Sequence, residues 1–180
     1  MITIENLINN NEWYIEPSEA KDFVKNGNLL SYKICNIELG KIRRWESKEK
    51  KVLQLKETIN YKFLSNQNSK YVREEYVKYC KEQKNLIDKP NRSPEIFINL
   101  YNKILKDGYD IKKGIICINQ NNTICIGLHR ACIMFFIYGG KFKIPVLKLK
   151  LKSSRLDIFI FYFYKIICYI KNLRLKNNEQ

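Results

Sequence analysis

The chain is poor in acidic residues, in histidine and in closely spaced cysteines. It holds 33 lysines and arginines against 18 aspartates and glutamates, which gives a net charge of +15. This charge favours an anionic partner, although scattered basic residues in a sequence rich in lysine, asparagine and isoleucine are also typical of an AT-rich gene. The six cysteines form no CxxC pair, and one histidine cannot complete a Cys/His zinc site. We therefore expect no metal site and expect the cysteines to be small buried side chains in a reducing compartment.

Signals for secretion or membrane spanning are also missing. The first residues, MITIENLINNNEW, have neither a basic nor an apolar region, so we expect a cytoplasmic protein. Residues 156–170 read LDIFIFYFYKIICYI between basic flanks, but the run is short and contains Asp157 and Lys165. Two interpretations stay open. The run is a terminal element that packs on the domain or on another subunit, or residues 156–176 lie peripherally on the anionic inner face of a membrane.

The most informative stretch of the sequence begins with two short apolar runs. Residues 114–118 and 123–126 are rich in β-branched side chains and have the length of strands. Between them, residues 119–122 are asparagines and glutamine, which favour a turn. The pattern predicts two strands joined by a polar turn.

A glycine loop and a helix follow these strands. Gly127 interrupts the second apolar run, and residues 131–138 are apolar enough for a buried helix. Gly139 and Gly140 end that helix, because glycine tolerates the left-handed conformation of a helix cap. Residues 144–147 predict a third strand. Together the stretch predicts a β-β-loop-α-β unit.

The glycine loop has the residues of a phosphate-binding site. Gly127 lets backbone N–H groups approach a ligand, and the helix start supplies unpaired N–H donors at Leu128 and the residues after it. Arg130 adds a guanidinium fork that matches phosphate oxygens, and His129 is the only histidine. The alternative is structural, with His129 capping a strand and Arg130 paired with a carboxylate.

Other segments predict helices and strands around this unit. Residues 29–42 alternate well enough for one or two strands. Apolar spacing predicts helices over 48–64 and 71–83. A third helix begins behind the capping pair Ser93-Pro94 and runs to Lys106.

The central stretch resembles the core of the ParB/sulfiredoxin-like superfamily. Its members have two strands, a loop of the form Gly-x-His-Arg or Gly-x-x-Arg, a helix that contains alanine, a glycine and a strand beginning Ile-Pro-Val. The chain departs from the pattern at Ile126, where many members have aspartate. The matching residues are Gly127, His129, Arg130, Ala131, Gly140, Ile144, Pro145 and Val146.

The resemblance extends to residues outside the central stretch. Residues 37–44 are similar to the strand that opens the superfamily domain, which implies that Glu38, Lys41 and Arg43 lie near the glycine loop. Residues 100–108 are similar to the helix before the first core strand. The implied fold is α+β, with opening strands at 29–44, a helical insertion at 48–92 and a core at 93–150. A single domain then spans residues 1–155, and an apolar helix with a basic tail follows at 156–180.

What the resemblance implies for function is nucleotide binding. Members bind nucleoside triphosphates on the glycine loop, which implies ATP or CTP with Mg²⁺ here, held by Gly127, Leu128, His129 and Arg130 with charge from Lys41 or Arg43. One branch phosphorylates free serine, so the first expectation is phosphotransfer from the nucleotide to a small metabolite or sugar. His129 then contacts phosphate or positions the acceptor. A carboxylate is the base or metal ligand, and the candidates are Glu38 and Glu46.

Two alternatives to phosphotransfer remain. Longer variants of this layout are linked with bacterial surface-polysaccharide synthesis, so the first alternative is a nucleotide-binding scaffold or switch in that process rather than an enzyme, with an oligomer possible. The second alternative is DNA or RNA binding, or a nuclease-like activity. Nucleic acid is the less favoured partner, because the sequence shows no recognition helix, zinc finger or aromatic RNA-binding motif.

Overall fold

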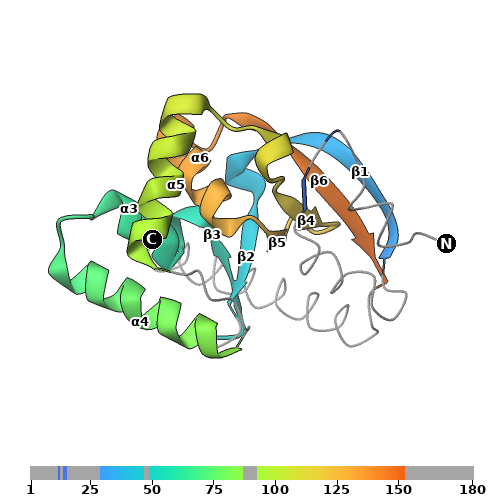
Figure 1. Cartoon of the computed structure of the whole chain (residues 1–180). Helices are drawn as coiled ribbons and strands as arrows, with labels where there is room; N and C mark the ends of the chain where they lie inside the picture. Colours follow the sequence, from blue (N-terminus) through green and yellow to red (C-terminus); the bar gives the residue numbers. More distant parts are fainter. Residues whose placement is uncertain (1–11, 13, 16–28, 47–48, 87–92, 153–180) are drawn as a thin grey trace, which may run out of the picture.

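The fold is α+β and is built on a four-stranded mixed sheet. The computed structural model describes residues 12, 14–15, 29–46, 49–86 and 93–152. The strand order is β1-β6-β4-β5, with β6 parallel to β4 and antiparallel to β1, and β5 antiparallel to β4. Figure 1 shows β1 and β6 as the two long strands of this sheet. The strands are β1 (Leu29–Glu38), β4 (Cys117–Asn119), β5 (Ile124–Ile126) and β6 (Lys143–Leu151).

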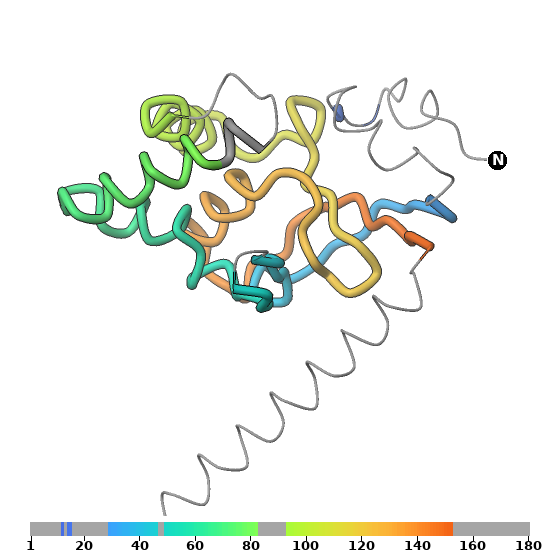
Figure 2. Tube along the Cα trace, turned by 90° about the horizontal axis from the view of Figure 1, so that it is seen from below, coloured from blue at the N-terminus to red at the C-terminus, as the bar shows by residue number. Residues whose placement is uncertain are grey.

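A hairpin and four α-helices complete the described part of the chain. The hairpin pairs β2 (Arg43–Glu46) with β3 (Lys51–Gln54). Figure 2 shows the helices gathered to one side of the molecule and the long strands on the other. The helices are α3 (Ile59–Ser65), α4 (Lys70–Leu86), α5 (Pro94–Asp107) and α6 (Leu128–Tyr138), with single 3-10 turns η2 (Leu39–Lys41), η3 (Leu55–Glu57) and η4 (Ile111–Lys113).

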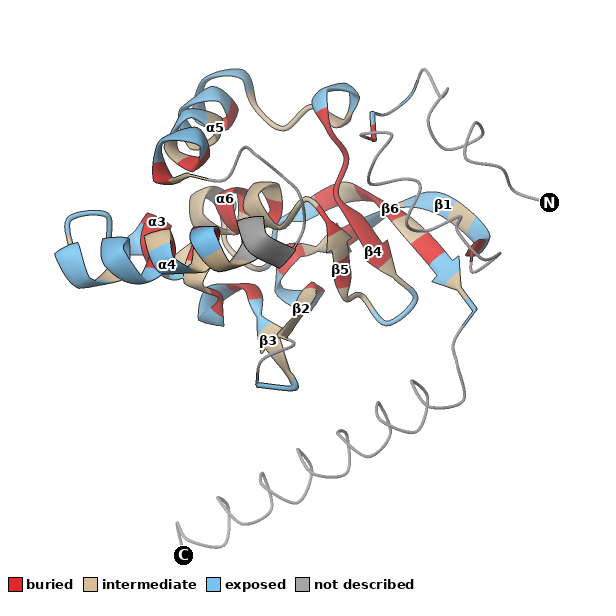
Figure 3. Ribbon diagram, turned by 60° about the horizontal axis from the view of Figure 1, so that its bottom comes forward, coloured by how far each residue is buried: buried red, intermediate tan, exposed pale blue. Residues whose placement is uncertain are grey.

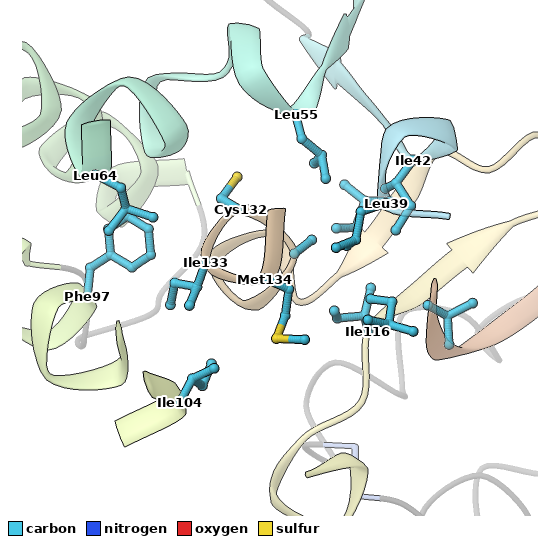
Figure 4. Close-up of a cluster of buried hydrophobic side chains, with 14 of the residues drawn as sticks. Leu39, Ile42, Leu55, Leu64, Phe97, Ile104, Ile116, Cys132, Ile133 and Met134 are labelled. Atoms are coloured by element: carbon cyan, nitrogen blue, oxygen red, sulfur yellow. The ribbon is translucent and has the colours of Figure 1, made fainter. Parts of the chain in front are cut away.

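The helix α6 is the centre of the larger hydrophobic core. Its residues Ala131, Cys132 and Ile133 are fully buried. Figure 4 shows side chains of α6 surrounded by residues from α3, α5, η2, η3 and the sheet. A helix this apolar is stable only when it is covered on most sides, which explains why elements from both halves of the described chain pack around it.

The sheet has an apolar face on each side. Ile116 and Ile118 of the β4 region pack into the core around α6, whereas Ile115 and Cys117 pack into a second cluster. This alternation follows from the two-residue period of a strand. Figure 3 shows the buried residues along β4 and β6, in contrast to the exposed outer face of α4.

Several predicted elements are confirmed with small shifts. The third helix begins after Ser93, whose Oγ accepts a hydrogen bond from Ile96 N at 3.3 Å, with Pro94 in the first helical position. The helix predicted over 71–83 is α4. The strand predicted over 114–118 is assigned only at 117–119, and Gly114, with a φ of +143°, caps the turn before it.

The helix predicted over 48–64 is wrong for most of its length. Residues 51–54 form β3, and a helix begins only at Ile59 behind Thr58, whose Oγ1 accepts from Tyr61 N at 3.3 Å. Pairing of β3 with β2 overrides the local helical spacing. The segment 48–92, expected to be a helical insertion, therefore also carries a strand.

The apolar segment 156–180 and the interpretations given for it lie outside the described residues. Across 29–46, 49–86 and 93–152, no helix has the length and apolar character needed to cross a bilayer.

Candidate functional site

The glycine loop is a sharp turn between β5 and α6. Gly127 has φ +84° and ψ +27°, which is the left-handed region, and it occupies the position before the first helical residue. A Cβ atom there would lie 3.1 Å from the Cα of Ile116. Both the conformation and the close approach to β4 therefore require glycine at this position.

The start of α6 has backbone donors without a side-chain cap. Gly127 offers no side chain, and the first intrahelical bond of the turn runs from Ala131 N to Gly127 O at 2.9 Å. The N–H groups of Leu128, His129 and Arg130 precede this bond and have no carbonyl four residues earlier within the helix. They are donors at the positive end of the helix dipole, which favours an anion.

The Arg130 side chain lies beside this turn, over the backbone that enters β4. Its Nη2 donates to the carbonyl oxygen of Lys113 at 3.2 Å. A Cβ on Gly114 would overlap the guanidinium. Arg130 forms no ion pair with a carboxylate of the described residues. The structural role considered for Arg130, pairing with a carboxylate, is therefore not found among the described residues.

Tyr109 lies near this site, and sequence reasoning missed it. The Tyr109 hydroxyl accepts from Ile116 N at 2.9 Å. Burial raises the pKa of Tyr109 above its ordinary value, the bond to Ile116 and the charge of Arg130 oppose this rise, and Cys117 and Asp110 add to it. The Arg130 guanidinium and the carboxylate of Asp110, the next residue in the chain, thus have opposite effects on the pKa of the Tyr109 hydroxyl.

The only signal for Asp110 in the sequence is its place after Gly108, just before the first core strand. Its Oδ1 accepts from Lys112 N at 2.9 Å, which caps η4. The carboxylate forms no ion pair with Arg130 among the described residues.

The His129 side chain points into the helical part of the core. Its Nε2 and the Tyr76 hydroxyl are 3.1 Å apart and share a hydrogen bond. Its ring lies 4.4 Å from the ring of Phe97, centroid to centroid. Burial raises the pKa of Tyr76 far above its ordinary value, with Cys80 adding to the effect. This geometry is that of a side chain that fixes the start of α6 against α4 and α5.

Glu38 and Lys41 lie at the other end of α6. Glu38 is opposite Lys143 in the β1–β6 ladder, and Gly40 N donates to Gly140 O at 2.8 Å, directly after the helix ends. With 11 residues at about 1.5 Å each, α6 separates this end from Gly127 by about 16 Å. The expectation that Glu38 and Lys41 lie near the glycine loop is not met, because the long β1–β6 register brings them to the end of the helix.

Two other candidates from the same region are also separate from the loop. Arg43 lies beside the start of β5, where Arg43 N donates to Asn122 O at 2.9 Å, and its guanidinium donates to the carbonyls of Gly40 and Ile42. Glu46 ends β2 opposite Lys51 in the hairpin. Of the predicted phosphate-binding residues, Gly127, Leu128, Arg130 and the backbone of His129 lie together at the loop, whereas the His129 side chain points into the core.

The sequence predicts buried, inert thiols, and this is confirmed for burial at some of the described cysteines only. Cys80, Cys117 and Cys132 are buried, while Cys35 and Cys125 are half-buried. Burial raises the pKa of the Cys132 thiol to about 12, and burial raises that of Cys125 to about 11 against the charge of Arg44. Neither thiol has the lowered pKa of a nucleophile.

Comparison with known proteins adds no assignment. No protein-family model matches the chain, and no curated protein or solved structure matches it either. In the described ranges, no group of three or more His, Cys, Asp or Glu side chains is placed to hold a metal ion. An open groove of about 430 Å³ runs along α4, away from the glycine loop, and is lined by Lys70, Arg73, Glu74, Val77, Lys78 and Lys81.

Proposed function

We propose that this chain is a nucleotide-binding protein that holds phosphate groups at the start of α6. The observation that carries the proposal is the left-handed Gly127, which begins α6 without a side-chain cap, together with the Arg130 guanidinium in the first turn of the helix. Phosphate oxygens accept hydrogen bonds from such N–H groups and pair with arginine in a bidentate fashion. The resemblance of the motif to the ParB/sulfiredoxin-like superfamily supports the same placement.

The nucleotide implied by the resemblance is ATP or CTP with Mg²⁺. Magnesium bound with a nucleotide is held mainly by phosphate oxygens and water, with one or two carboxylates from the protein. Asp110 is a carboxylate that shares the surroundings of Tyr109 with Arg130. Asp110, which follows Tyr109 in the chain, is the carboxylate that we propose would contact the metal of a bound Mg²⁺–nucleotide.

Phosphotransfer to a small metabolite or sugar is the second candidate. Transfer needs positive charge on the phosphate and a base near the acceptor hydroxyl. Asp110 favours this candidate, since it supplies the carboxylate that Ile126 does not. Glu38 lies at the far end of α6, so the proposal assigns it no part. Without an acceptor, the same site is a nucleotide-dependent scaffold or switch, for example in surface-polysaccharide synthesis.

Calorimetric titration tests the binding site. ATP, CTP, GTP and ADP are titrated with Mg²⁺ into the wild type and into Arg130→Ala, with Arg73→Ala as the matched control. Arg73 is an exposed arginine that pairs with Glu95 on the helices at 3.1 Å. We expect binding of at least one triphosphate that weakens tenfold or more in Arg130→Ala and by less than twofold in Arg73→Ala. No binding by the wild type would overturn the proposal.

A turnover assay separates the two candidates. Release of ADP that depends on Mg²⁺ and rises with added serine or sugar would support phosphotransfer. In that case we expect Asp110→Asn to abolish turnover while binding persists, and Asp107→Asn to retain turnover. Asp107 is the control because its carboxylate pairs with Lys113 at 3.6 Å. Binding with no turnover leaves the scaffold or switch function.

A further inference from the structure

The turn after α6 carries two aromatic rings on the protein surface. Tyr138 and Phe142 stack with a centroid distance of 4.5 Å and an interplanar angle of 19°. Their side chains are 45% and 42% exposed, respectively. Aromatic rings of this size are usually buried, so an exposed stacked pair is a feature that packing alone does not explain.

The backbone around this pair is held in place by β1 and η2. Leu39 N donates to Phe142 O at 3.0 Å, and Gly40 N donates to Gly140 O at 2.8 Å. A Cβ on Gly140 would lie 3.2 Å from the ring of Phe135. The backbone of the turn is thus held in place, which lowers the entropic cost of ordering it when a ligand binds.

Three lysines belong to the turn that carries the rings or to the segment bonded to it. Lys141 and Lys143 flank Phe142 in the sequence, and both are exposed. Lys41 belongs to η2 and pairs with Glu38 at 3.3 Å. Neither Lys141 nor Lys143 forms an ion pair with a carboxylate of the described residues. Local positive charge therefore exceeds negative charge.

We propose that this aromatic–lysine surface, made of Tyr138, Phe142, Lys41, Lys141 and Lys143, binds single-stranded nucleic acid. A base stacks on the outer face of the ring pair, and the lysines contact the flanking phosphates. Proteins that bind single strands combine these two elements, because every base has a stacking face and every linkage has a negative charge. The net charge of +15 adds general attraction for such a strand.

The geometry favours a single strand over a duplex or a membrane. Bases of a duplex are stacked on one another and offer no free face. Side chains that anchor a protein in a bilayer protrude into it, whereas Tyr138 and Phe142 are each less than half exposed and their rings stack on each other. The surface is also separate from the glycine loop, since it lies at the opposite end of α6.

Fluorescence anisotropy of a labelled 12-nucleotide oligothymidine tests the proposal with the full chain. We expect saturable binding that weakens with salt, with a slope of about −2 in a double-logarithmic plot if three lysines contact phosphates. We expect a duplex of the same length to bind more weakly. An excess of ATP does not compete, and Arg130→Ala binds the oligonucleotide as the wild type does, which keeps this test distinct from that of the nucleotide site.

Substitutions of the rings and of one lysine locate the contact. Tyr138→Leu and Phe142→Leu keep apolar volume but remove the stacking faces, and each should weaken binding roughly ten- to a hundredfold. Tyr71→Leu is the control, because Tyr71 is 74% exposed on α4 and should change affinity by less than twofold. Lys141→Gln should reduce the salt slope by about 0.7. Lys78→Gln, on α4, should leave it unchanged.

Several results would overturn the proposal. One is the absence of oligothymidine binding by the wild type. A second is binding that the ring variants and Lys141→Gln leave unchanged, which would mean general attraction by charge alone. A third is binding to phosphatidylserine vesicles, but not to the oligonucleotide, that the same variants abolish. Lys141→Gln changes only an exposed side chain, so its effect on the salt dependence of oligonucleotide binding still tests the proposal if a ring variant unfolds.

Discussion

The two ends of α6 meet their surroundings in different ways. At the first end, the aromatic rings around His129 are buried, and the polar groups that face outward are backbone N–H donors and Arg130. At the last end, the rings of Tyr138 and Phe142 are exposed, and lysines flank Phe142 in the sequence. Rings at one end stabilise the helix, while rings at the other are available to a partner.

The largest expected contrast is between a buried and an exposed phenylalanine. Phe97 is fully buried and contacts the rings of Phe63, Tyr76 and His129. We expect Phe97→Ala to lower the free energy of unfolding by about 3–5 kcal/mol, and Phe142→Ala to lower it by less than about 1 kcal/mol. Urea denaturation of both variants measures this. Equal losses would contradict the distinction between the two ends.

A buried amide on α3 allows a test of the core that lies between the two ends of α6. Asn60 is 1% exposed, and neither atom of its carboxamide has a hydrogen-bond partner among the described residues. We expect Asn60→Leu to raise the free energy of unfolding by about 1–3 kcal/mol, since it removes unsatisfied polar groups. The exposed loop change Asn68→Leu is the control and should have little effect. A loss of stability in Asn60→Leu would mean that the amide has a stabilising role.

Stability at high pH tests how tightly α6 is enclosed. The Cys132 thiol has an ordinary pKa of 9.0, which burial raises to about 12 in the fold. Its contribution to stability is complete below pH 9 and falls as pH rises toward 12, because the unfolded chain ionises first. The slope is up to about 1.4 kcal/mol per pH unit. Urea midpoints measured from pH 7 to 10.5 should fall less steeply in Cys132→Ala; identical slopes would argue against a buried thiol.

The smallest effect concerns the contact that fixes the start of α6. Tyr76→Phe removes the hydroxyl that shares a hydrogen bond with His129 Nε2. We expect a loss of about 1 kcal/mol in unfolding free energy, with oligonucleotide binding at the other end unchanged. Thermal melting and anisotropy measure the two quantities. Unchanged stability together with lost nucleotide binding would show that His129 acts on the ligand rather than on the fold.

The elements whose ends are set by neighbouring residues could be predicted from the sequence. Ser93-Pro94 marks the start of α5 because the capping hydroxyl and the fixed φ of proline act within one turn. Gly127 and the glycines after Tyr138 likewise bound α6 by their own conformations. The loop, the helix and the adjacent Arg130 could therefore be predicted from the sequence.

Contacts between distant segments were not predictable in the same way. The placement of Glu38 depends on nine paired positions between β1 and β6, more than a hundred residues apart, and local pattern does not specify such a register. The contact of Arg130 with the Lys113 carbonyl depends on the turn at Gly114, where a Cβ would overlap the guanidinium. Residues 51–54 have helical spacing but gain more from pairing with β2.

The most direct test of the central claim is an amide NMR titration of the ¹⁵N-labelled chain with Mg²⁺-ATP. Each end of α6 has its own backbone amides, so the spectrum reports which end binds. We predict saturable shifts for the amides of Gly127, Leu128, His129 and Arg130, with those of residues 139–143 unchanged. Shifts confined to residues 38–41 and 139–143, or no shifts at all, would contradict the claim.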